Sequence, residues 1–130
     1  MILIFGGVYQ GKLDYALNRF GLAENEVFFC RDTDINAPDG TSAGKKIVYE
    51  IDKWILALVK ADINVTEKIK QFASDNTEAV VICNDISCGV VPVDPVLRKW
   101  REETGRAAGY LSQCADEVVR LFCGIPARLK

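Results

Sequence analysis

The first thirteen residues limit the fold of this chain more than any other segment. The apolar run Met1–Phe5 is typical of a buried strand, and a helical pattern begins soon after it at Lys12. Between them, Gly6–Lys12 spells G-x-x-x-x-G-K. Glycines at this spacing let successive backbone N–H groups surround a phosphate, which a lysine then reaches. The segment therefore predicts a phosphate-binding loop (P-loop) between a first strand and a first helix.

The residue after the lysine departs from the complete motif. Leu13 stands where the hydroxyl of a Ser or Thr would bind Mg²⁺. The alternative to a phosphate site is a tight turn with a solvated lysine, but a cation at a helix N-terminus opposes the helix dipole, which favours anion binding. Tyr9 would either cover a ligand ring or fill the phosphate space. The nucleotide contacts expected from this segment are Gly6, Gly7, Val8, Tyr9, Gln10, Gly11, Lys12 and Leu13.

The rest of the chain alternates between strand-like and helix-like patterns. We expect strands over residues 2–5, 26–30, 46–49, 79–83, 117–123 and 125–129. Helices are expected over residues 12–20, 50–60, 64–74 and 96–114. This order predicts a three-layer α/β fold of the P-loop NTPase type (RecA-like), with a mainly parallel sheet and an antiparallel C-terminal strand pair. Because no repeat or linker interrupts it, residues 1–130 should form a single domain.

The composition excludes several kinds of site. The chain contains no histidine, which rules out a Ser-His-Asp triad, histidine metal ligands and a covalent histidine intermediate. A net charge of −2 offers no basic surface for nucleic acid. No apolar run reaches the ~20 residues that span a bilayer, so we expect a cytoplasmic protein with no membrane contact. The five cysteines form no C-x-x-C pair and fit a reducing compartment. Cys83 and Cys123 lie in apolar runs and are expected to be buried.

Three loops follow predicted parallel strands and should meet at the carboxyl edge of the sheet, where open α/β sheets bind ligands. These loops are residues 6–12, 30–32 and 84–89. The second loop supplies further candidate nucleotide contacts, namely Cys30, Arg31 and Asp32. The candidate contacts to substrate or phosphate are Asn84, Gly89 and Arg106. The alternative for the arginine is a solvated side chain on a helix.

Charged residues near this edge are candidates for catalysis and metal binding, and each has a structural alternative. Lys12 and Asp85 are the candidate catalytic residues. Asp85 would hold Mg²⁺ or orient a substrate hydroxyl, or it would form a turn with Asn84. Glu50 and Asp52 flank a predicted strand-to-helix turn, where both would be displaced metal ligands and Glu50 would bind nucleotide and Mg²⁺. The alternative, which we favour for both acids, is that they cap and charge the first helical turn.

Several segments together resemble one enzyme family. Ile4–Lys12 is similar to the G-G-x-x-S-G-K-S loop of the bifunctional adenosylcobinamide kinase / adenosylcobinamide-phosphate guanylyltransferase family of cobalamin biosynthesis. Val80–Pro92 resembles its V-x-N-E-V-G-x-G-I-V-P segment, and Gly105-Arg106 followed by Ala115–Val118 resembles its G-R-x-N-Q…A-D-E-V ending. Trp54 matches the tryptophan segment of the family. The resemblance implies ATP or GTP with Mg²⁺, a corrinoid (cobinamide) substrate and a homo-oligomer.

The chain also departs from this family at functional positions. The family's guanylylated histidine is missing, so guanylyl transfer by that route is excluded. The family's acid at the end of the third strand falls on Tyr49, and its Asn and Gln after G-R fall on Ala108 and Gly109. Three hypotheses follow. The chain is a reduced cobinamide-type kinase, a catalytically inactive corrinoid-binding or assembly protein, or a P-loop switch or small-molecule kinase outside this pathway.

Overall fold

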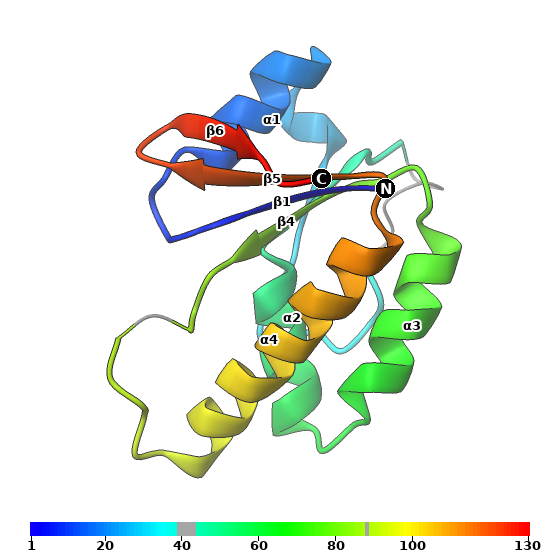
Figure 1. Cartoon of the computed structure of the whole chain (residues 1–130). Helices are drawn as coiled ribbons and strands as arrows, with labels where there is room; N and C mark the ends of the chain where they lie inside the picture. The colour runs from blue at the N-terminus through cyan, green and yellow to red at the C-terminus, as the bar shows by residue number, and fades with distance from the viewer. Residues whose placement is uncertain (39–43, 88) are drawn as a thin grey trace.

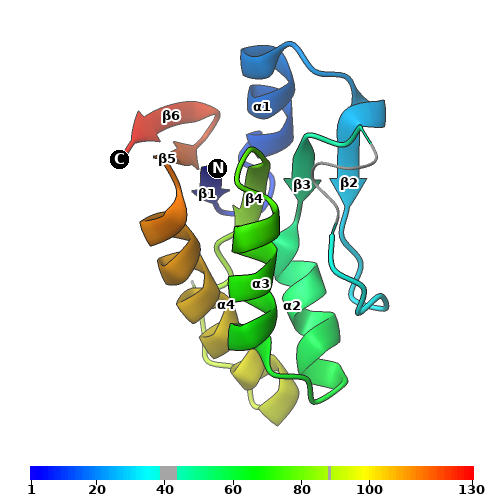
Figure 2. The ribbon, with the colours of Figure 1, turned by 90° about the vertical axis from the view of Figure 1, so that its right-hand side faces the viewer.

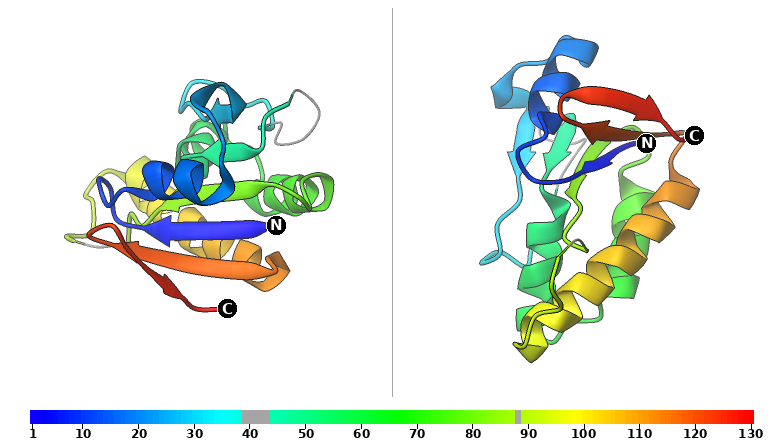
Figure 3. Two further views of the ribbon diagram at one scale, coloured as in Figure 1. Left: turned by 90° about the horizontal axis from the view of Figure 1, so that it is seen from above. Right: turned by 60° about the vertical axis from the view of Figure 1, so that its left-hand side comes forward.

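The computed structural model describes residues 1–38, 44–87 and 89–130. Within these residues, six strands form one sheet in the order β2-β3-β4-β1-β5-β6 (Figure 1). The strands are β1 (Ile2–Gly6), β2 (Val27–Phe29), β3 (Ile47–Tyr49), β4 (Val80–Asn84), β5 (Glu117–Phe122) and β6 (Ile125–Arg128). All neighbouring strands are parallel except β5 and β6. The structure thus confirms the mainly parallel sheet and its antiparallel C-terminal pair, with β1 between β4 and β5 (Figure 3).

Helices cover both faces of this sheet. They are α1 (Lys12–Phe20), α2 (Ile51–Lys60), α3 (Val65–Asp75) and α4 (Pro95–Cys114). Helix α1 packs on one face, and α2, α3 and α4 pack on the other (Figures 1 and 2). This is the predicted three-layer α/β arrangement of the P-loop NTPase type. Among the described helices, none has the length and apolarity that a membrane span requires.

Alternating side chains of the strands fill two separate cores. On the α2–α4 side, Leu3 of β1 belongs to a cluster that includes the buried Trp54 of α2 and Phe72 of α3. On the α1 side, Ile4 packs in a cluster with Ala16 of α1. Because side chains along a strand point alternately to its two faces, adjacent residues of β1 serve opposite layers. The central strands β1 and β4 therefore carry apolar residues on both faces and only one polar side chain, Asn84 at the end of β4, as expected for a sheet covered on both faces.

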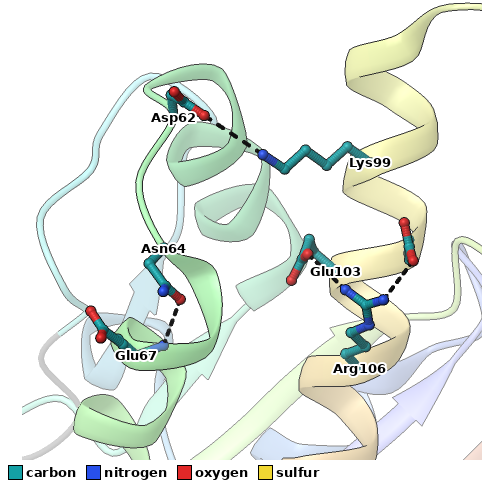
Figure 4. A network of polar contacts seen from close by, with 7 residues as sticks. Asp62, Asn64, Glu67, Lys99, Glu103 and Arg106 are labelled. Carbon is teal, nitrogen blue, oxygen red and sulfur yellow. Dashed lines mark hydrogen bonds and ion pairs between the residues drawn. The ribbon is translucent and has the colours of Figure 1, made fainter.

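Local signals define where the helices begin and end. Asp94 caps α4, because its Oδ1 accepts hydrogen bonds from the Val96 N–H at 2.8 Å and the Leu97 N–H at 3.3 Å. Asn64 caps α3 by accepting from the Glu67 N–H at 3.1 Å (Figure 4). At the end of α1, the left-handed conformation with φ 62° suits Gly21, which lacks a side chain.

One predicted burial position is wrong. Cys123 is exposed, because β5 ends at Phe122 and the cysteine lies in the turn before β6 with φ 50°. Leu97, in the first turn of α4, is 38% exposed. The N-terminal end of α4 lies far from the sheet, and the helix approaches the strands only towards its C-terminus (Figures 1 and 2). Its first turn therefore has little to pack against, whereas Leu111 near the other end is fully buried.

Candidate functional site

A cavity of about 670 Å³ opens at the carboxyl edge of the sheet, where the three predicted loops meet. We call it the P-loop cavity. Its walls come from the P-loop, the segments after β2 and β3, the start of α2, the end of β4 and one side chain of α4. The lining residues are Val8, Tyr9, Gln10, Gly11, Lys12, Cys30, Arg31, Asp32, Thr33, Tyr49, Glu50, Asp52, Lys53, Leu56, Asn84, Ile86 and Trp100.

The P-loop is hydrogen-bonded to the turn between β5 and β6. The Gln10 carbonyl accepts a hydrogen bond of 3.1 Å from the Gly124 N–H, and the Gln10 side-chain oxygen accepts one from the Cys123 N–H. Tyr9, at the tip, has φ 61° and is 99% exposed. Its ring therefore does not fill the space inside the loop.

Lys12 points back into the P-loop. Its Nζ donates a hydrogen bond of 2.5 Å to the Gly7 carbonyl oxygen, and the residue is only 4% exposed. Burial lowers the pKa of the Lys12 ammonium, while the negative charge of Asp52 opposes that shift. A buried cation within a ring of backbone groups is the arrangement that a phosphate-binding loop needs.

A polar network forms the floor of the cavity and joins α2 to β4. The Asp52 carboxylate accepts hydrogen bonds from the Asn84 backbone N–H at 3.0 Å and the Asn84 side-chain Nδ2 at 3.2 Å. The same Nδ2 donates to Glu50 Oε1 at 3.3 Å, and Lys53 Nζ lies 2.5 Å from Glu50 Oε2. Trp100 of α4 donates through Nε1 to the Asp52 carbonyl oxygen at 2.6 Å. Burial raises the pKa of the Asp52 carboxyl.

The favoured role of the two acids is wrong in its capping part, whereas the structure does place Asp52 as an acid in the first turn of α2. Glu50 occupies the position before α2, with φ 58°, but its side chain makes no capping hydrogen bond. Asp52 lies in the first helical turn, yet its carboxylate bonds to Asn84 on β4. Two donors of one asparagine satisfy this carboxylate, and the residue is buried.

Asp52 is thus a cavity residue for which the sequence favoured capping over metal binding. One signal in the sequence could have placed it in the interior. Asp52 shares the helical spacing i, i+3, i+4 with Ile55 and Leu56, which are apolar. A lone acid on an apolar helix face next to a predicted strand end requires a buried partner.

Several predicted site residues lie elsewhere. Asp85 does not line the cavity: its Oδ1 accepts from the Ser87 N–H at 3.0 Å, which favours the turn alternative, and its Oδ2 lies 3.8 Å from Arg120. Arg106 forms ion pairs of 2.6 and 3.1 Å with Glu102 and Glu103 on the surface of α4 (Figure 4). The remaining predicted residues outside the lining are Gly6, Gly7, Leu13 and Gly89. Cys88 lies outside the described residues.

The donor set of the cavity fits a metal–nucleotide complex. In the part of the chain that the structure describes, no group of three or more His, Cys, Asp or Glu side chains could hold a metal ion alone. Mg²⁺ in nucleotide sites is usually held by one or two carboxylates together with the phosphates and water. Glu50 and Asp52, joined through the Asn84 amide, supply oxygens of that kind.

The comparisons identify one family. The family model for cobinamide kinase / cobinamide phosphate guanyltransferase matches residues 41–129, which is more than half of the chain. The matched span contains the acids and Asn84 of the cavity floor, whereas the P-loop precedes it. A search of curated proteins gives no match.

Proposed function

The chain belongs to the cobinamide kinase / cobinamide phosphate guanyltransferase family, and on this basis we propose that it binds ATP or GTP with Mg²⁺ at the P-loop. The reaction class that fits is transfer of the terminal phosphoryl group to a hydroxyl of a cobinamide-type corrinoid. One observation carries the proposal: buried Lys12 and the acids of the cavity floor line the same cavity. Guanylyl transfer through a histidine is not possible, because the chain has none.

The chain's own residues divide the work of phosphoryl transfer. The P-loop N–H groups and Lys12 stabilise the charge on the phosphates, since this reaction depends mainly on positioning and electrostatics. Glu50 and Asp52 are the residues that would hold Mg²⁺, which neutralises phosphate charge when bound. Ile86, Leu56 and Trp100 form an apolar part of the cavity wall, where the acceptor would approach.

Calorimetric titration with ATP and GTP, each with and without Mg²⁺, tests this function. Lys12→Ala should weaken nucleotide binding at least about tenfold, because it removes a charged hydrogen-bond donor. Lys99→Ala is the matched control, since Lys99 is exposed on α4 and pairs with Asp62 at 3.7 Å (Figure 4). Equal thermal melting of both variants would show that the loss is not unfolding.

The remaining outcomes separate the alternatives. Formation of phosphorylated cobinamide from bound nucleotide would support the kinase. Corrinoid binding without nucleotide binding at millimolar concentration would contradict it and favour the inactive binding or assembly protein. Nucleotide-dependent turnover of other small alcohols only would move the chain outside this pathway.

We further propose that the chain forms the homo-oligomer that its family resemblance implies. An unusually apolar exposed surface supports this, consisting of Val90, Val91, Val93, Val96 and Leu97. Contiguous apolar patches on soluble proteins commonly mark interfaces. Analytical ultracentrifugation of Val93→Asp against the unaltered protein tests it, with a smaller assembly expected for the variant and an unchanged mass contradicting the proposal.

A further inference from the structure

Two opposite charges are buried in the P-loop cavity without forming a direct pair. Lys12 is 4% exposed and Asp52 is 2% exposed, and both line the cavity. Lys12 donates to the Gly7 carbonyl instead. Within residues 1–38, 44–87 and 89–130, neither charge has an ion-pair partner within 4.0 Å. Each charge can therefore interact with a charged ligand that enters the cavity.

Asp52 cannot easily turn away when a ligand enters. Both of its carboxylate oxygens accept hydrogen bonds from Asn84, at 3.0 and 3.2 Å. Its carbonyl oxygen is held by Trp100 at 2.6 Å. Three elements, α2, β4 and α4, thus fix the negative charge in one place. A fixed charge in a partly desolvated cavity acts strongly on any ion that enters.

The other acids near the cavity are largely compensated. Glu50 lies 2.5 Å from Lys53, and Asp32 lies 3.0 Å from Lys60. Asp85 lies 3.8 Å from Arg120 and outside the cavity lining. Asp52 is consequently the carboxylate whose charge opposes a phosphate approaching Lys12.

We propose that Asp52 makes the P-loop select a metal-bound oligophosphate over a metal-free one. A free oligophosphate that engages Lys12 brings several negative charges towards a fixed carboxylate, which repels them. A divalent cation on the phosphates reverses this interaction, because the carboxylate then faces positive charge. The family resemblance places an acid at the end of the third strand, where this chain has Tyr49. Asp52, in the first turn of α2, takes the role of that acid here. The inference rests on the proposed phosphate binding at the P-loop.

The test compares Asp52→Asn with the unaltered protein. Asparagine keeps the shape of the side chain and can still accept from the Asn84 N–H, while the Asn84 amide can turn to pair with it. Titration calorimetry with ATP and with inorganic tripolyphosphate, in Mg²⁺ and in EDTA, gives four dissociation constants for each protein. In EDTA, Asp52→Asn should bind both ligands about tenfold more tightly. In Mg²⁺ the variant should bind both ligands as tightly as the unaltered protein does, or more weakly. The advantage of the metal, which is the ratio of the dissociation constant in EDTA to that in Mg²⁺, should therefore fall.

Matched variants separate this effect from general loss of charge. Asp62→Asn removes an exposed acid after α2 that pairs with Lys99 at 3.7 Å and lies outside the cavity lining, and it should leave the advantage of the metal unchanged. Asp52→Ser, which also removes the charge, should act in the same direction as Asp52→Asn and serves if the latter folds poorly.

The outcomes distinguish the inference from the proposed function. Retained binding with an unaltered ratio of metal-free to metal-bound affinity in both Asp52 variants overturns the inference alone. Absence of any phosphate binding by the unaltered protein at millimolar concentration overturns the proposed function as well.

Discussion

Replacing Gly6 by alanine should destabilise the protein, whereas the same replacement at Gly105 should stabilise it. A Cβ atom on Gly6 would lie 2.5 Å from the backbone carbonyl oxygen of Leu121 in β5. Strand β1 cannot move aside, because it pairs with β4 on one side and β5 on the other. A Cβ atom on Gly105, in the middle of α4, would meet no atom within 4 Å.

The two changes differ in sign and in size. Forcing an extra carbon into a packed site costs about 1–3 kcal/mol. Replacing a glycine in a helix interior by alanine contributes about 0.5–1 kcal/mol of stability, since alanine loses less backbone entropy on folding. For a chain of this size, 1 kcal/mol corresponds to about 3–5 °C in Tm. The two variants should therefore melt on opposite sides of the unaltered protein.

Thermal and urea unfolding followed by circular dichroism measure both effects. If Gly6→Ala has the stability of the unaltered protein, the close approach of β1 to β5 is not a packing constraint and the reasoning is refuted. A variant that loses nucleotide binding at full stability would instead show that Gly6 serves the ligand. Destabilisation by Gly105→Ala would refute the assignment of that position to an open helix face.

Two other properties can be tested independently. Burial raises the pKa of the Cys30 and Cys83 thiols. Iodoacetamide should therefore modify exposed Cys114 and Cys123 in the native protein, and the buried pair only in urea. Peptide mapping by mass spectrometry checks this, and modification of Cys83 in the native protein would contradict it. Burial raises the pKa of Asp52 above its ordinary 3.8, so the folded state holds this proton to higher pH than the unfolded chain. Its stabilising contribution is thus lost as pH rises from about 4 through the folded-state pKa. Urea unfolding across that range should show a decline that Asp52→Asn lacks, and parallel profiles would contradict it.

Element positions could be predicted because local signals define them. Helix α1 spans Lys12–Phe20 as expected, since glycines stand at both of its ends. The cap and proline at Asp94-Pro95 likewise mark the start of α4. The parallel direction of most strands then follows from the alternation of strands and helices, and it brings the three loops to one edge.

Side-chain partners across the sheet could not be predicted in the same way. Asp52 and Asn84 are 32 positions apart, and nothing in the local pattern of either residue indicates the other. Capping was therefore the nearest explanation for an acid at a helix start. Asp85 was assigned to the site for its position after β4, but its carboxylate bonds to Ser87, because a short polar side chain readily closes a turn. The predicted burial of Cys123 was wrong because the strand ends one residue earlier, at Phe122, so that Cys123 lies in the exposed turn.

The hydrogen bonds from the β5–β6 turn to Gln10 have a consequence for the order in which the site forms. The Gln10 side chain and the Cys123 N–H that it accepts from are 113 positions apart. During synthesis the P-loop leaves the ribosome more than a hundred residues before the residues that brace it. Contacts at such separation form late, because the whole intervening chain must be ordered to close them. The P-loop should thus reach its final shape only when the β5–β6 hairpin docks against it.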